Sequence, residues 1–121
     1  MNGMIRGPFA LSALLLLTAA IPSVPPNAIS GELIDTYCYA KVGVRGAPHA
    51  ACALKCVRAG IAAGLLESKT RRVYVLLPSA DATALPPALV AQMGHEVEIS
   101  GDVIAKGGTN FLTVRSFRLT R

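Results

Sequence analysis

Four residues in one short stretch, Cys38 to Gly60, have the types and spacing that metal chemistry requires. They are Cys38, His49, Cys52 and Cys56, and they include all three cysteines of the chain. On a helix, residues three and four positions apart share a face, so His49, Cys52 and Cys56 would line one stripe. Three cysteines with one histidine form a common tetrahedral zinc shell, and soft thiolates also favour Cu(I). The spacing predicts a metal site for copper or zinc.

Two neighbouring residues could orient the histidine of this site. Asp35 and Tyr39 flank Cys38, and either side chain could hydrogen-bond His49, as the outer partners of metal-bound histidines do. Cys38 is expected at the end of a strand, and a glycine-bearing loop lets it fold back onto the helix. A metal would contribute directly to the folding of so small a domain.

The same cysteines allow a second interpretation, a disulfide that joins Cys38 to Cys52 or Cys56. Closing a loop of about 15 residues contributes roughly 3 kcal/mol in the entropic model. Cys52 with Cys56 is less favoured, because residues i and i+4 hold their Cβ atoms about 5–6 Å apart and a disulfide needs about 3.8 Å. In this interpretation the third cysteine is an apolar thiol and His49 faces solvent. The protein would then be a disulfide-linked adaptor that binds a protein or an envelope glycan.

A third interpretation, thiol–disulfide exchange through Cys52 and Cys56, has less support in the sequence. The thioredoxin-type Cys-x2-Cys motif is absent. The chain also has no Gly-x-Ser-x-Gly motif and no phosphate-binding glycine loop. We therefore expect a protein that is not an enzyme.

The N-terminal residues 1–30 are expected to be a signal peptide followed by a proline-rich junction. Arg6 precedes Phe9 to Ile21, an uncharged and mostly apolar run. This run is short for a membrane span, which needs about 20 residues, but it suits the apolar part of a secretory signal. Small residues offer cleavage after Ala20 or after Ser30. The pattern predicts a periplasmic or secreted protein without a membrane span after cleavage.

The charge of the remaining chain argues against nucleic acid as a partner. From Gly31 onward there are 11 Lys and Arg residues and 7 Asp and Glu residues, a formal charge of +4. The basic residues are scattered apart from Arg71-Arg72, and the chain has no Trp. Nucleic-acid binding normally requires clustered cations with stacking aromatics. The expected partner is an unidentified protein or another envelope component.

Residues 31–121 are expected to form a single domain. Alternation and turn residues predict strands at 31–37, 61–67, 73–77, 96–104 and 111–120, and helices at 48–59 and 88–93. Residues 40–47 are expected to form a loop. Gly101 should bend the fourth strand, Arg115-Ser116 should bulge the fifth, and residues 106–110 should form a hairpin turn.

This order of elements predicts a mainly β (α+β) domain, and specifically a small OB-like five-stranded barrel. In that fold a short helix lies between strands three and four, as expected here. The Cys/His segment 38–60 is then an insertion that carries a helix between strands one and two. A generic α+β sandwich fits almost as well.

The motif residues also resemble a group of small exported bacterial proteins of unassigned function. The shared pattern is Gly-x3-Asp-x2-Cys-Tyr, followed by His-x2-Cys-Ala-x2-Cys-x3-Gly, before a β-rich tail. It is found here from Gly31 to Tyr39 and from His49 to Gly60. The resemblance covers nearly all of the expected mature chain. It implies the same boundaries and the same site, and no particular activity.

Overall fold

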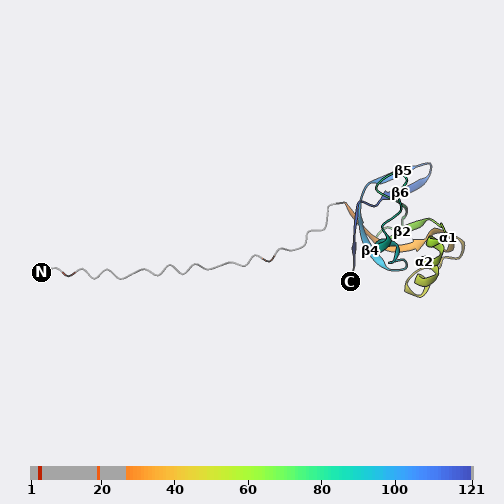
Figure 1. The fold of residues 1–121 in the computed structure, drawn as a ribbon, viewed down its shortest axis with the longest axis horizontal. Helices are drawn as coiled ribbons and strands as arrows, with labels where there is room; N and C mark the ends of the chain where they lie inside the picture. The colour runs from red at the N-terminus through yellow and green to blue at the C-terminus, as the bar shows by residue number, and fades with distance from the viewer. Residues whose placement is uncertain (1–2, 4–18, 20–26, 121) are drawn as a thin grey trace.

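The computed structural model describes residue 3, residue 19 and residues 27–120 (Figure 1). The expected signal peptide and its first cleavage point lie outside the described ranges. In chain order the elements are β1 (Ala28–Asp35), α1 (Thr36–Val42), the 3-10 turn η1 (Ala47–His49), α2 (Ala50–Arg58), β2 (Ala63–Glu67), β3 (Val73–Leu77), α3 (Pro87–Val90), β4 (Glu96–Ser100), β5 (Val103–Lys106), β6 (Thr109–Thr113) and β7 (Ser116–Leu119). No described helix has the length and apolar character needed to cross a membrane.

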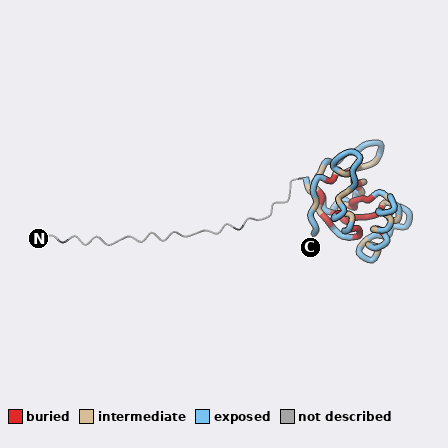
Figure 2. Tube along the Cα trace, viewed as in Figure 1, coloured by how far each residue is buried: buried red, intermediate tan, exposed pale blue. Residues whose placement is uncertain are grey.

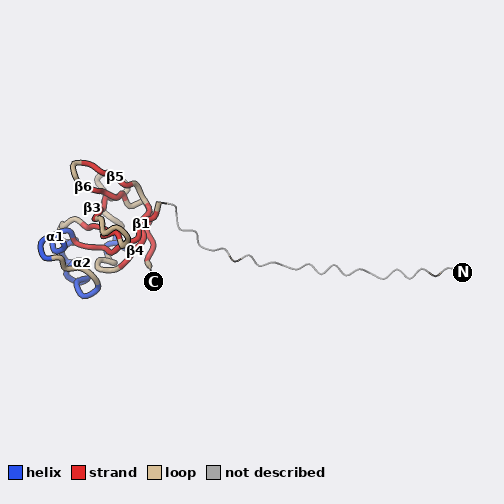
Figure 3. Tube along the Cα trace, turned by 180° about the vertical axis from the view of Figure 1, so that it is seen from behind, coloured by secondary structure: helices blue, strands red, loops and turns tan. Residues whose placement is uncertain are grey.

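The described strands form one mixed sheet in the order β5-β6-β3-β2-β1-β4-β7. The pair β3 and β6 is parallel, and the other neighbours are antiparallel. The predicted mainly β (α+β) class is confirmed, with helical segments between β1 and β2 and between β3 and β4. Figure 3 shows the strands gathered on one side and α1 with α2 on the other.

The predicted five-stranded OB-like barrel is wrong, because two of its strands are broken and its outer strands do not pair. The fourth predicted strand becomes β4 and β5, and the fifth becomes β6 and β7. Gly101 lies at the first break, where a Cβ atom would come within 1.5 Å of the Thr113 carbonyl oxygen. Arg115 lies at the second, where its N–H bonds to the Ser100 carbonyl instead of continuing a regular strand pair. The chain departs from a regular strand at both predicted positions, but each strand breaks there instead of bending or bulging.

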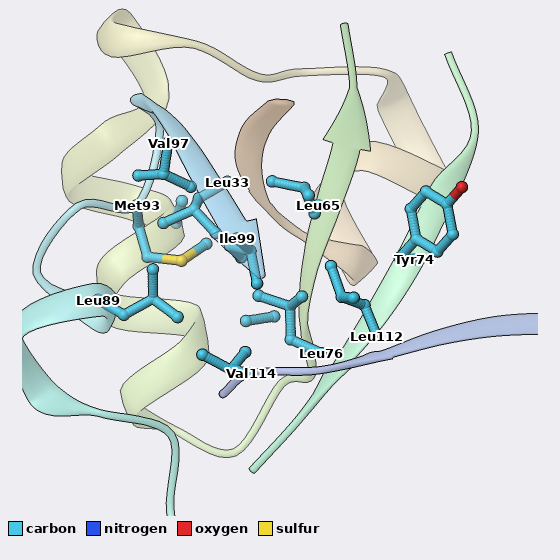
Figure 4. Packing of buried hydrophobic residues seen from close by; sticks show 12 residues of the cluster. Leu33, Leu65, Tyr74, Leu76, Leu89, Met93, Val97, Ile99, Leu112 and Val114 are labelled. Atoms are coloured by element: carbon cyan, nitrogen blue, oxygen red, sulfur yellow. The ribbon is translucent and has the colours of Figure 1, made fainter. Parts of the chain in front are cut away.

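The sheet curves around a single core. β5 begins only three residues after β4 ends, yet the two strands lie near opposite ends of the strand order, so the sheet must curl to bring them together. Apolar residues from five strands and two helices fill the inside (Figures 2 and 4). They are Leu33, Ala53, Ala63, Leu65, Tyr74, Leu76, Leu89, Val97, Ile99 and Leu112, together with Met93 in the turn after α3 and Val114 just after β6.

The segment between β1 and β2 differs from its prediction in one important respect. Residues 31–37 were expected as a strand and 40–47 as a loop, but β1 ends at Asp35 and α1 covers Thr36–Val42. Asp35 accepts a hydrogen bond from the Cys38 N–H, and Gly43 ends the helix in the left-handed region at φ 71°. The aspartate is thus an N-cap and the glycine a C-cap, a pair that defines a short helix.

The helix α2 is fixed to the sheet by its apolar face. Ala53 is fully buried in the core, and Leu54 and Val57 pack against it. The turn before β4 approaches α2 so closely that a Cβ on Gly94 would lie 2.8 Å from the Cα of Ala50. Figures 1 and 3 both show α1 beside α2, at one end of the sheet.

The start of β1 leads to a prediction about truncation. Ala28, Ile29 and Ser30 pair with β4, and Ile29 packs against the core, so the strand begins before Gly31. A protein that begins at Gly31 should be less stable than one that begins at Asn27 by about 1–3 kcal/mol, through lost apolar burial and backbone hydrogen bonds. Urea unfolding of the two forms would measure the difference. Equal midpoints would contradict the assigned strand pairing.

Candidate metal centre

A buried aspartate joins the sheet to both helices of the Cys/His segment. Asp35 is 1% exposed and is the last residue of β1. One carboxylate oxygen, Oδ1, accepts a hydrogen bond of 2.8 Å from the Cys38 N–H in α1. The other, Oδ2, lies 2.9 Å from His49 Nε2 at the start of α2. Of the two residues predicted to orient His49, Asp35 makes the expected hydrogen bond.

The surroundings of Asp35 keep its carboxylate ionised. Burial raises its pKa, but the hydrogen bonds from the Cys38 N–H and from His49 outweigh burial and hold the pKa below its ordinary value of 3.8. An ionised carboxylate only accepts hydrogen bonds, so His49 Nε2 carries the proton in this contact. In a neutral imidazole the lone pair then lies on Nδ1, which is the arrangement of a histidine ready to bind a metal.

The three cysteine sulfurs converge beside this pair. Cys38 comes from α1, and Cys52 and Cys56 come from successive turns of α2. Their Sγ atoms all lie within 4.8 Å of one another, so the group could hold a metal ion. The three residues are free thiols in the structure, and none of them is in a disulfide.

The predicted fourth ligand, His49, lies next to part of this group. Its ring nitrogen, Cys38 Sγ and an Asp35 oxygen are also within 4.8 Å of one another, but His49 is not that close to all three sulfurs. The four predicted residues therefore form two overlapping groups that share Cys38. The side chain of His49 is 16% exposed and bonded to Asp35, so its interpretation as a solvent-facing residue is wrong.

The surroundings of Cys38 and Cys56 disfavour the thiolate form of both residues. Burial raises the pKa of the Cys38 thiol to about 12, with further contributions from its hydrogen bond to Asp35 and from the negative charge of that carboxylate. Burial and then the charge of Asp35 also raise the pKa of Cys56. Because the thiolate is the nucleophile, these two cysteines are poorly suited to nucleophilic catalysis.

The centre is open on the side of Cys52. Cys52 is exposed, whereas Cys38 and Cys56 are partly buried. An exposed cysteine leaves its sulfur accessible from solvent. A soft ion could therefore reach the sulfurs, or leave them, through Cys52.

A second ion pair holds the loop between α1 and η1. Arg45 Nη1 lies 2.7 Å from Glu32 Oε2, and Glu32 is largely buried in β1. The other oxygen, Glu32 Oε1, is buried without a hydrogen-bond partner among the described residues. The carboxylates of Glu32 and Asp35 thus fix both ends of the segment that carries Cys38.

The sequence contained signals for the elements that its interpretation misplaced. Asp35, three residues before Cys38, is a typical N-cap, and Gly43 is a typical helix end. Together they define α1 and move Cys38 from a strand end to a helix. The Arg45–Glu32 pair had no such signal, because it joins side chains that only the fold brings together.

No model of a known protein family matches this chain, and comparisons with curated proteins and with solved structures give no match either. The resemblance to a group of small exported bacterial proteins therefore stays a prediction. Any function must be argued from the geometry of the centre.

The Asp35–His49 contact gives a prediction on stability with a matched control. His49→Ala should lower the free energy of unfolding of the metal-free protein by about 1–3 kcal/mol, because it leaves a buried carboxylate oxygen without its donor. His95 is exposed, and none of the described side-chain hydrogen bonds involves it, so His95→Ala should change stability by less than about 0.5 kcal/mol. Urea unfolding with a chelator present would measure the free energy of unfolding of both variants. Equal losses of stability in the two variants would contradict the Asp35–His49 contact.

The lowered pKa of Asp35 gives a prediction on pH. A carboxylate whose pKa is lower in the folded state than in the unfolded state stabilises the fold at pH values above the unfolded-state pKa. This stabilisation is lost as pH falls through the folded-state pKa. The wild type should therefore exceed Asp35→Asn in stability at about pH 7, and the difference should shrink below about pH 4. Chelator-treated protein unfolded in urea across this range would test it. A constant difference would show that Asp35 is not ionised.

Proposed function

We propose that this chain is a small exported, non-enzymatic module that binds a soft or borderline metal ion, Cu(I) or Zn(II). Cys38, Cys52 and Cys56 are the primary ligands, and His49 completes the set when the ion binds. The observation that carries the proposal is the convergence of three sulfurs from two helices within 4.8 Å. The protein would store or deliver the ion, and its partner would be another envelope component.

The spacing of the sulfurs suits such an ion after a small contraction. Zinc–sulfur bonds of about 2.3 Å in a tetrahedral shell place neighbouring sulfurs about 3.8 Å apart. Side-chain rotations can supply the difference, because α1 has no buried residue and Cys52 is exposed. The Asp35 contact leaves the lone pair of His49 Nδ1 available, and a rotation of the His49 side chain would be needed to bring this nitrogen to the ion.

The charge of the site also favours a cation. Asp35 is a buried carboxylate, and its negative charge adds to burial in raising the pKa of both Cys38 and Cys56. A metal ion would replace the thiol protons and offset the carboxylate at the same time. Binding should therefore release protons and strengthen as pH rises.

The expected place of action is the periplasm or the exterior of the cell. It rests on the apolar run from Phe9 to Ile21. Cleavage after Ala20 leaves β1 complete, whereas cleavage after Ser30 removes its first three residues. The earlier point is therefore the one that we propose.

The alternative function is a disulfide-linked adaptor, and one observation favours it. Cys38 lies within 4.8 Å of both helical sulfurs, so a small movement would allow it to pair with Cys52 or Cys56, and thiols outside the cytoplasm tend to oxidise. The loop from Gly43 to Gly46 would then contact a protein or a glycan. Thiol–disulfide exchange has less support, since the raised pKa of Cys56 disfavours its thiolate.

Metal content and free thiols separate these functions. We expect protein purified without reducing agent to hold about one copper or zinc ion per chain and, once denatured with a chelator, to show all three thiols. Elemental analysis and thiol titration give these values. A single free thiol without metal would overturn the metal site in favour of the adaptor.

Substitutions on α2 provide the matched test of the ligands. Cys52→Ser should weaken metal binding by at least about 100-fold in competition with a chelator, because it removes one of three sulfurs. Ala51→Ser places the same side chain one position away on the exposed surface and should bind as the wild type does. Equal affinities of the two variants would exclude Cys52 as a ligand.

A further inference from the structure

We propose that the helical segment from Thr36 to Gly60 is a docking surface for anionic lipid headgroups. It combines unpaired cations with exposed apolar side chains. The argument uses only charge, exposure and position, so it does not depend on whether a metal binds. The occupant is a lipid surface rich in anionic headgroups, such as phosphatidylglycerol.

The first observation is the division of charge along the chain. Residues 36–66 contain four Lys and Arg residues and no Asp or Glu. The four are Lys41, Arg45, Lys55 and Arg58, and all are exposed. The carboxylates just before them, Glu32 and Asp35, are buried.

The second observation is that three of these cations lack an opposite charge. Arg45 is paired with Glu32, but none of the ion pairs in the described part of the chain involves Lys41, Lys55 or Arg58. On the β4–β7 side, Arg115 is paired with Asp102 and Arg118 with Glu98. The positive charge left unpaired on the helical segment is therefore available to a negatively charged partner.

The third observation is the exposure of apolar side chains on the same segment. Tyr37 is 57% exposed, Val42 70% and Val44 40%. Gly43, between the two valines, has open space around the position that a Cβ would take. The apolar residues and Lys41 with Arg45 thus occupy one short exposed stretch.

This combination matches a membrane surface better than a protein partner. Cations near an anionic leaflet attract it, tyrosine rings favour the headgroup level, and small apolar side chains enter just below. A protein partner would usually bury a larger packed apolar patch with aromatic anchors.

Vesicle binding by charge variants tests the proposal. The full chain is expressed, and the protein that is purified from the cells is mixed with two kinds of vesicle. One kind contains phosphatidylcholine alone, and the other contains equal parts of phosphatidylcholine and phosphatidylglycerol. Lys41→Gln with Lys55→Gln should weaken binding to the anionic vesicles by about 25-fold, at roughly fivefold per cation. Lys69→Gln with Lys106→Gln removes the same net charge outside the segment and should change binding by less than about threefold. Equal losses would overturn the proposal, as would equal binding to both kinds of vesicle.

A site-specific reporter gives an independent measurement. The chain has no Trp, so Val42→Trp introduces a single fluorophore at an exposed position, since Val42 is 70% exposed. Its emission should shift to the blue when anionic vesicles are added, and the shift should weaken between about 50 mM and about 300 mM NaCl as salt screens the cations. Leu119→Trp, on the exposed edge strand β7, should show no shift. A shift at position 119 alone, or tighter binding of polyglutamate than of the vesicles, would reject the lipid surface as the partner.

Discussion

The structure of the Cys/His segment depends on one buried carboxylate, that of Asp35. A charge with 1% exposure is costly unless donors surround it, and Asp35 takes its donors from the Cys38 N–H and from His49. The first contact caps α1, and the second holds the start of α2. Because both helices are attached to the same side chain, Cys38 must lie beside Cys52 and Cys56.

The same carboxylate gives the centre its chemical character. Burial and then the charge of Asp35 raise the pKa of Cys38 and Cys56, which disfavours thiolate nucleophiles. The negative charge of the carboxylate would attract a cation. The sheet supplies rigidity on one side, where Ala53 and Val57 fix α2 to the core. Helix α1 has no buried side chain of its own and is held through its N-cap at Asp35 and through the Arg45–Glu32 pair.

Local patterns were enough to predict much of the fold. The strand Val73–Leu77, the helix that carries Cys52 and Cys56, and the turn at Gly107-Gly108 follow from apolar runs, capping and glycines in the left-handed region. The bend at Gly101 was also visible. The break between β4 and β5 could not be predicted from the bend alone. A side chain at this position would clash with the Thr113 carbonyl, which is distant in sequence. The strand number and the absence of closure therefore could not be predicted from local patterns.

The sequence by itself determined which residues can do chemistry, since the spacing of His49, Cys52 and Cys56 places the two cysteines on one helical face wherever that helix lies. Only the tertiary structure decided how they meet. It placed Cys38 on a helix, brought its sulfur to the other two, and turned His49 toward Asp35. The physical reason is that helical periodicity is a local property, whereas the partners of a buried charge are chosen by packing between distant segments.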